Sequence, residues 1–384
     1  MNYSKMLNNF KWGICFMAEN KTHWLVKLSL YLVILIFCMI FAFYLGRMSN
    51  DKFSTCNTLT KMNEPQSMFN ETDTTNPVVQ AQNSTATNNQ PTQLAATSQS
   101  TEYVYVLNAN TTTISLCRAN PLNGLLDTTC ASTGTGFNAP YAISFNSSKT
   151  LAYIANTGGN NVSTCKINHS TASLEDCMIT GSGFDGPSGI AIDDKRGFAL
   201  ISNMRSNSVS VCTLDSQSGN LSNCRLTGSG FTAPDDIEIS TDGRFAYIAN
   251  TITNDVSICN VDPTTDSLSN CSFTGSNFSD PQSIDFSING KYAYVTNNGA
   301  NTVSLCTINK TTGIFENCTA TGSGFDGLSD LSVNTTGTRA YISMNHLVSV
   351  CSINPDSGLF SNCTSTGGGF NIPSGINVIS VGTR

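Results

Sequence analysis

The sequence has few charged side chains and almost no histidine. Only 12% of its 384 residues are charged, and its three histidines are His23, His169 and His346. These histidines occupy unrelated positions along the chain, which argues against a histidine-based metal site or acid–base centre. The sequence also contains no C-x-x-C pair, so the ligand spacing typical of zinc sites is missing.

The few charged residues are unevenly distributed. Residues 1–100 contain seven Lys/Arg and five Asp/Glu, a net charge of +2. Residues 101–384 contain twelve Lys/Arg and twenty-one Asp/Glu, a net charge of −9. Because an acidic domain repels phosphate backbones, we expect no nucleic-acid partner.

Residues 28–46 form an apolar run without charge, LSLYLVILIFCMIFAFYLG. As a helix this run would extend roughly 28 Å, close to the hydrocarbon thickness of a bilayer. Lysines dominate residues 1–27, so the positive-inside rule predicts a cytoplasmic N-terminal segment. A cleaved signal peptide is the alternative, but it would have a shorter apolar region and small residues at its end. We predict a single-pass anchor, with the rest of the chain periplasmic or extracellular.

Residues 47–101 are rich in Asn, Ser, Thr and Gln and contain few large apolar residues. They show no hydrophobic period. Such a segment buries too little surface to offset the entropy of ordering its backbone. The composition therefore predicts a disordered stalk between the anchor and the following domain.

From residue 102 onward the chain repeats itself. A segment of the type Ala-Tyr-Ile-Ala-Asn recurs every 47 residues, beginning at Ala152, Ala199, Ala246, Ala293 and Ala340. Each repeat contains four short segments rich in β-branched and aromatic residues, with turn signals such as Asp242-Gly243 between them. No helical period intervenes. Each repeat therefore predicts four antiparallel strands, as in one blade of a β-propeller.

The two ends of the repeat region complement each other. The first unit, at Tyr103, lacks the strand of the P-x-x-I-x-I type that precedes the other units in exact or related form, and the chain ends with a spare one from Pro373. Pairing this last strand with the first three completes one blade and leaves no exposed edge. An open solenoid would need polar capping repeats, and the sequence has none. We therefore predict an all-β, six-bladed propeller over residues 102–384.

Tyr294-Val-Thr-Asn297 and its neighbours resemble the YVTN family of β-propeller repeats. The strand Pro187-Ser-Gly-Ile-Ala-Ile192 is similar to strands of NHL and lactonase-type propellers. The resemblance extends from Tyr103 to Arg384 and implies the propeller fold. Members of these families range from surface and envelope proteins to sugar-lactone hydrolases, so the resemblance implies no single activity. The paired cysteines of this chain depart from the family pattern.

Each repeat contains two cysteines, on the two outer strands that a hairpin joins. Directly opposed Cβ atoms on such strands lie within about 5 Å, close enough for a disulfide. The predicted pairs are Cys117/Cys130, Cys165/Cys177, Cys212/Cys224, Cys259/Cys271, Cys306/Cys318 and Cys351/Cys363. Metal binding is the alternative, but the ligand spacing does not favour it. Disulfides require an oxidising compartment, in agreement with the predicted orientation of the anchor.

Acidic residues that differ between blades are candidates for a ligand site at the mouth of the central channel. They are Asp185, Asp235, Asp236, Glu238, Asp280, Asp285, Asp326 and Asp330. Converging carboxylates would suit a hard cation such as Ca²⁺, and no other cofactor is expected. The alternative is that these acids are solvated loop residues. One phenylalanine recurs in the glycine-rich loop of all six repeats, which indicates packing between blades: Phe137, Phe184, Phe231, Phe278, Phe325 and Phe370.

Three functions remain open at this stage. We favour a membrane-anchored binding or scaffolding module for an envelope protein, a glycan or a small ligand. A lactonase-like hydrolase is the second possibility, but it would need an asymmetric cluster of catalytic groups, and the domain has acids and almost no histidine. A purely structural envelope protein is the third. The sequence designates no catalytic residue.

Overall fold

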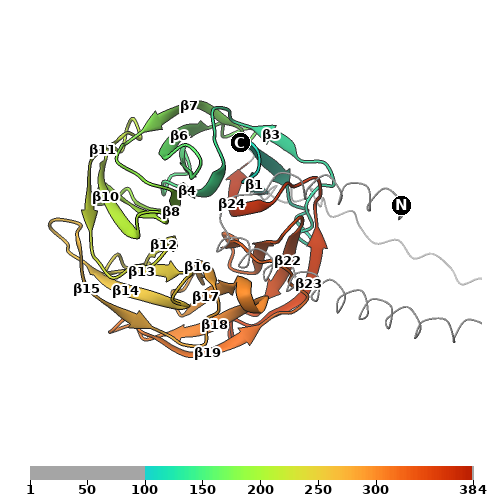
Figure 1. The fold of residues 1–384 in the computed structure, drawn as a ribbon. Helices are drawn as coiled ribbons and strands as arrows, with labels where there is room; N and C mark the ends of the chain where they lie inside the picture. Colours follow the sequence, from blue (N-terminus) through green and yellow to red (C-terminus); the bar gives the residue numbers. More distant parts are fainter. Residues whose placement is uncertain (1–99, 383–384) are drawn as a thin grey trace, which may run out of the picture. The chain divides into compact units, whose positions relative to one another are not determined.

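The computed structural model describes residues 100–382, which form six four-stranded antiparallel sheets arranged in a ring (Figure 1). The six-bladed propeller is thereby confirmed. The predicted N-terminal segment, anchor and nearly all of the stalk lie outside the described residues. Within residues 100–382, no helix is long and apolar enough to cross a membrane.

The blades are numbered along the chain. The first contains β1 (Ser100–Asn108), β2 (Thr113–Arg118), β3 (Ala131–Thr133) and β24 (Pro373–Gly382). The second contains β4 (Pro140–Phe145), β5 (Leu151–Asn156), β6 (Asn161–Ile167) and β7 (Leu174–Thr180). The third contains β8 (Pro187–Asp193), β9 (Phe198–Asn203), β10 (Ser208–Leu214) and β11 (Leu221–Thr227).

The fourth blade contains β12 (Pro234–Ile239), β13 (Phe245–Asn250), β14 (Asp255–Val261) and β15 (Leu268–Thr274). The fifth contains β16 (Pro281–Phe286), β17 (Tyr292–Asn297), the 3-10 turn η1 (Asn298–Ala300), β18 (Thr302–Ile308) and β19 (Phe315–Thr321). The sixth contains β20 (Leu331–Val333), β21 (Arg339–Ser343), β22 (Val348–Ile353) and β23 (Phe360–Thr366).

The ring closes through a blade built from both ends of the described chain. Strand β24 pairs antiparallel with β1, from Ser100 opposite Gly382 to Asn108 opposite Pro373. Figure 1 shows the red final strand beside the blue-green first strand. This pairing excludes the open solenoid, because it leaves no unpaired inner strand at either end.

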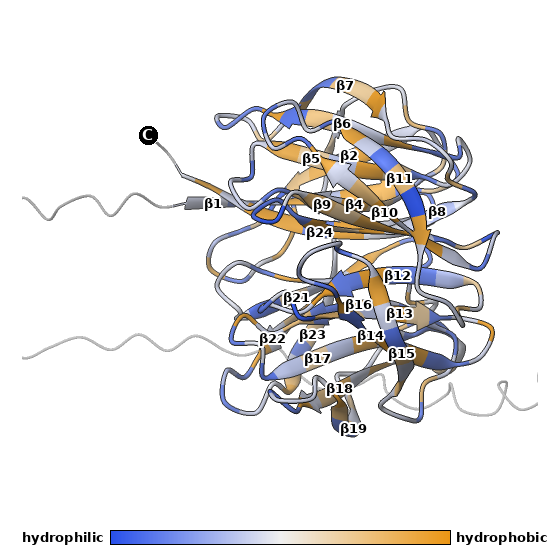
Figure 2. Ribbon diagram, turned by 90° about the vertical axis from the view of Figure 1, so that its left-hand side faces the viewer, coloured by the Kyte–Doolittle hydropathy of each residue, from blue (hydrophilic) through white to orange (hydrophobic). Residues whose placement is uncertain are grey.

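Hydrophobic layers between neighbouring blades form the core, and Figure 2 shows hydrophobic residues in the strands of adjacent sheets. The recurring phenylalanine is at most 8% exposed in every blade. Phe184, for example, packs in one cluster with Cys212 and Cys224 of the next blade. The prediction that these rings pack between blades is therefore confirmed.

A repeated hydrogen bond also joins each blade to the next. The hydroxyl of Thr180, at the end of β7, accepts the backbone N–H of Leu221 on β11 at 2.6 Å. The same bond recurs at 2.6–2.7 Å in the pairs Thr133–Leu174, Thr227–Leu268, Thr274–Phe315, Thr321–Phe360 and Thr366–Leu126. The last pair ties the sixth blade to the first, so the bond runs around the whole ring.

The six predicted disulfides are all present, with Cα–Cα distances between 4.0 and 4.6 Å. They join Cys117 to Cys130, Cys165 to Cys177, Cys212 to Cys224, Cys259 to Cys271, Cys306 to Cys318 and Cys351 to Cys363. The pairing is therefore confirmed in every blade. Two details of its predicted geometry are wrong, one in the first blade and one in the other five.

In the first blade, Cys130 does not lie on an outer strand as predicted. Strand β3 begins one residue later, at Ala131, and extends over only three residues. The hairpin before it is one residue longer than in the other blades, since Cys117 and Cys130 are 13 residues apart and the other pairs 12. The disulfide thus fastens the end of this longer connection to β2.

In the other five blades, the predicted direct opposition of the two cysteines is wrong, because a β-bulge lies at the bond. In the sixth blade the register shifts between Val350 and Ser352, so Cys351 faces both Asn362 and Cys363. The residue before the second cysteine has a φ of 49–52° in each of these blades. Asn or Asp, which tolerate this left-handed conformation, occupy the position: Asp176, Asn223, Asn270, Asn317 and Asn362.

Candidate functional site

The innermost strand of each blade lines the central channel, and the acids that line a cavity in it all come from the fourth, fifth and sixth blades. Asp236 and Glu238 lie on β12, Asp285 lies on β16, and Asp330 directly precedes β20. The corresponding positions of β4 and β8 hold Ala142, Ser144, Gly189 and Ala191. The six blades are therefore alike in fold but differ in the chemistry that they present to the channel.

A cavity of about 220 Å³ lies in the channel beside these acids. Its lining includes Asp236, Glu238, Asp285 and Asp330, together with Lys149. Lys149 lies in the turn between β4 and β5, at the end of the channel opposite the glycine-rich loops. Four carboxyl groups and one amine thus share a small space.

Three of these carboxylates bind the backbone of the following blade. An inner strand has a sheet partner on only one side, so its other edge carries free N–H groups. Asp236 accepts the N–H of Ile284 at 2.8 Å. The same relation joins two further pairs, Asp285 with Val333 at 2.7 Å and Asp330 with Ile376 at 2.8 Å. Each acid also accepts the N–H of the residue that follows it.

Burial shifts the acid–base equilibria of the cluster. It raises the pKa of Asp236 to about 8, and the nearby Asp330 adds to the effect. Burial likewise raises the pKa of Asp285 to about 7 and that of Asp330 to about 6, against the backbone hydrogen bonds that stabilise their charged forms. The pKa of Glu238 lies well above its ordinary value, again through burial. Burial lowers the pKa of Lys149, although Asp285 and Glu238 oppose this. The cluster therefore exchanges protons near neutral pH.

Asp235 is more deeply placed than its neighbours, with 2% of its surface exposed. One carboxyl oxygen accepts the hydroxyl of Tyr141 at 3.2 Å, and the other has no hydrogen-bond partner. Burial, and then the charge of Asp236, hold the pKa of Asp235 well above its usual range. Asp235 therefore holds its proton more firmly than an ordinary aspartate.

The structure brings together half of the eight acids predicted for the channel mouth. Asp236, Glu238, Asp285 and Asp330 line the cavity inside the channel. Asp235 is buried beside Tyr141, and Asp280 is half-buried in the loop before β16, where burial raises its pKa. Asp185 and Asp326 lie exposed in glycine-rich loops, away from the cavity.

Sequence reasoning missed Lys149, Thr335 and Asn377, which also line the cavity. Asn377 was detectable, because it occupies in β24 the repeat position of Glu238 and Asp285. Lys149 lies in a turn and has a φ of 54°, so no strand pattern indicated its direction. Within residues 100–382, no three His, Cys, Asp or Glu side chains are grouped so that they could hold a metal ion.

Comparison with known proteins identifies the family. The model described as "Lactonase, 7-bladed beta-propeller" matches residues 98–233 and 225–327. The chain belongs to this lactonase family. It is a six-bladed member, although the family description names seven blades. Among curated proteins, no relative matches the chain.

Solved structures share the fold of this lactonase-family chain at low sequence identity. A periplasmic gluconolactonase of Pseudomonas aeruginosa has a TM-score of 0.54 and 15% identity, covering 69% of this chain and 83% of its own. A putative 6-phosphogluconolactonase of Bacteroides uniformis has a TM-score of 0.53 and 17% identity, covering 71% and 84%. A chain of the nidogen/laminin complex has a TM-score of 0.56 and 11% identity, covering 72% and 98%. At these identities the likeness concerns the fold alone.

Proposed function

We propose that this chain is an extracytoplasmic binding propeller that takes an uncharged or cationic polyhydroxylated small molecule into its channel. The observation that carries the proposal is the cavity of about 220 Å³ lined by four carboxyl groups and one amine. Carboxyl groups that are partly protonated both donate and accept hydrogen bonds, which suits the hydroxyl groups of a sugar. Those acids that are ionised, together with the net negative charge of residues 101–384, disfavour phosphorylated or carboxylated ligands.

The asymmetry of the channel supports binding over a purely structural role. A spacer would have no need for acids on three blades and small residues on the opposite two. The three backbone contacts made by these acids also keep them in fixed positions, which reduces the ordering entropy that a ligand would have to overcome.

Hydrolysis of an uncharged sugar lactone is the second candidate function. Family membership favours it, and so do the pKa values of about 7 for Asp285 and about 6 for Asp330. A carboxylate would take a proton from water as the water oxygen attacks the lactone carbonyl. The ring C–O bond would then break, and the ring oxygen would take up a proton, leaving the hydroxy acid. Lys149, which lines the same cavity, would stabilise the developing negative charge.

The location and attachment of the propeller are part of the proposal. Six disulfides favour an oxidising compartment outside the cytoplasm. The apolar run at residues 28–46 would hold the domain at the outer side of a membrane. There it would meet small solutes, glycans and other proteins of the cell envelope.

The full chain in detergent tests the two candidates. Calorimetric titration with glucosamine, glucono-1,5-lactone and 6-phosphogluconate should give binding for the first two only. Asp285→Asn should weaken this binding, whereas Asp326→Asn, the same change on an exposed loop, should not. Acid release from the lactone, followed at constant pH, decides between binding alone and hydrolysis. Preferred binding of 6-phosphogluconate would reject the proposed charge selectivity.

A further inference from the structure

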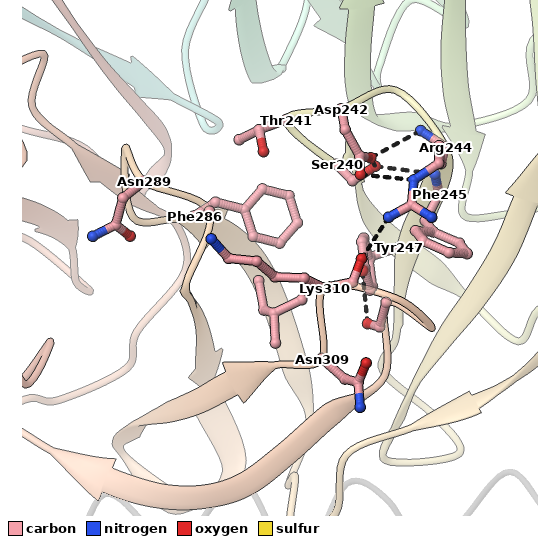
Figure 3. A pocket seen from close by; sticks show the side chains of 13 residues that line it. Ser240, Thr241, Asp242, Arg244, Phe245, Tyr247, Phe286, Asn289, Asn309 and Lys310 are labelled. Carbon is pink, nitrogen blue, oxygen red and sulfur yellow. Dashed lines mark hydrogen bonds and ion pairs between the residues drawn. The ribbon is translucent and has the colours of Figure 1, made fainter.

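A second cavity, of about 240 Å³, lies outside the channel, between the fourth and fifth blades. It is enclosed by the turn between β12 and β13, the end of β16 and the turn between β18 and β19. Figure 3 shows Thr241, Phe286 and Lys310 around it, with the Lys310 side chain extending toward Phe286. This seam pocket shares no residue with the acidic cavity of the channel.

An arginine crosses the seam of this pocket one repeat position later than in the preceding seam. Between the third and fourth blades, Arg196 reaches across and donates to the carbonyl of Gly243 at 2.7 Å and to Asp266 at 3.0 Å. The residue one repeat later is Gly243 itself. The next residue, Arg244, crosses to the fifth blade instead and donates to the backbone carbonyls of Lys310 and Thr311.

The following seam is filled in another way. There Ile288 lies against Gly337, where an added Cβ would be 3.0 Å from the isoleucine methyl group. The hydroxyl of Tyr292 also closes that seam by donating to the carbonyl of Asp356 at 2.6 Å. In the seam pocket, the counterparts of these two residues are the smaller Thr241 and Phe245.

Aromatic rings form the walls of the seam pocket. Tyr247 and Phe286 meet edge to face, with their ring centroids 5.3 Å apart, and Phe245 lies beneath the guanidinium of Arg244 at 4.9 Å. That guanidinium is held by Asp242 at 2.8 Å and by backbone carbonyls of the β18–β19 turn. The walls are thus fixed before any ligand binds, which favours binding.

The local charge of the seam pocket is opposite to that of the domain. Arg244 and Lys310 outnumber Asp242 among its lining residues, whereas residues 101–384 carry a net charge of −9. The amine of Lys310 makes no ion pair within residues 100–382. An anionic group is therefore favoured here, although the domain as a whole repels anions.

We propose that the seam pocket binds a single acidic sugar ring, a hexuronate. Its volume is below the ~300 Å³ at which sites for drug-sized ligands begin, so it suits one ring and not an oligosaccharide. The apolar face of the pyranose packs on the aromatic walls. The carboxylate pairs with Lys310, and Thr241 and Asn289 face the hydroxyl groups.

Glucuronate titrated into the full chain in detergent, followed by ligand-observed NMR and calorimetry, tests the proposal. We expect glucuronate to bind roughly tenfold or more tightly than glucose, because a charged hydrogen bond contributes about 1.5–3 kcal/mol. Lys310→Glu should abolish the preference. Lys291→Glu is the matched control, because Lys291 binds the backbone of the next seam, and it should bind glucuronate like the unchanged protein.

Thr241→Ile fills the seam pocket with the side chain that the protein itself uses at Ile288. We expect it to weaken binding of both sugars while leaving the melting temperature unchanged. Asp285→Asn, in the channel, should not affect glucuronate, which separates this site from the proposed channel function. Equal binding of glucose and glucuronate, no binding of glucuronate, or unchanged binding in Lys310→Glu would each overturn the proposal. If Thr241→Ile folds poorly, the Lys310 comparison alone decides.

Discussion

The carboxylate of Asp285 accepts the backbone N–H of Val333 at 2.7 Å. An acid of the fifth blade thus provides a hydrogen-bond acceptor for an N–H on the unpaired edge of the inner strand of the sixth blade. Replacing Asp285 with Ala should leave this N–H without its partner and lower the free energy of unfolding by about 1–3 kcal/mol. Asp285→Asn keeps an acceptor and should lose much less. Chemical denaturation of both variants measures the difference, and equal losses would show that the bond contributes little.

The raised pKa values of the channel acids predict that the protein is more stable in mild acid. The folded-state pKa values of Asp236, Asp285 and Asp330, at about 8, 7 and 6, all lie above the ordinary value of 3.8. The folded protein therefore binds more protons than the unfolded chain between these values, and stability falls as the pH rises through them. Calorimetry should give a lower melting temperature at about pH 9 than at about pH 5.

A matched variant isolates this effect. Asp236→Asn combined with Asp330→Asn removes two of the titrating groups and should flatten the pH dependence. A double Asp→Asn variant at the exposed Asp185 and Asp326 should leave it as it is. An unchanged slope in the channel variant would assign the pH dependence to other groups.

The bulge beside five of the six disulfides leads to a prediction about Asn270. This residue directly precedes Cys271 and has a φ of 49°. Asn270→Val forces a β-branched side chain into the left-handed region and should destabilise the fold by about 1–2 kcal/mol. Asn270→Gly should stay within a few tenths of the unchanged protein, since glycine adopts this conformation freely. Urea unfolding of the two variants provides the measurement.

The disulfides predict that the stability of the propeller depends strongly on their oxidation. Replacing Cys306 and Cys318 together by Ala should cost about 2–4 kcal/mol of unfolding free energy, because the bond restricts the unfolded chain. Peptide mapping without reducing agent should recover this pair and the five others. Free thiols at these positions in the native protein would remove the argument for an oxidising compartment.

The fold could be predicted from the sequence because its determinants recur. The spacing of 47 residues predicted the blades and their four strands, and the spare strand from Pro373 predicted the composite first blade. The site depends on differences between blades, which a repeat does not describe. Asp235 and Asp236 are neighbours in sequence, yet one side chain contacts Tyr141 and the other lines the cavity.

The seam pocket was even less predictable from the sequence than the acidic cavity. It exists because Thr241 stands where the next blade has Ile288, a difference of little weight in any motif. The smaller side chain leaves a cavity only because the β12–β13 turn packs against the β18–β19 turn. The bulge before Cys363 and the short strand after Cys130 likewise depend on local register, which the cysteine spacing alone did not specify.

The pairing of β1 with β24 sets the order of events during synthesis. Ser100 has to remain without its partner on that side until Gly382 has left the ribosome. The two strands are the most distant in the described chain, so the entropy of joining them is the largest of any strand pair. The five other blades can form as they emerge, but the ring closes only once β24 is free to pair. Loss of β24 would therefore leave the first blade without its inner strand and the ring open.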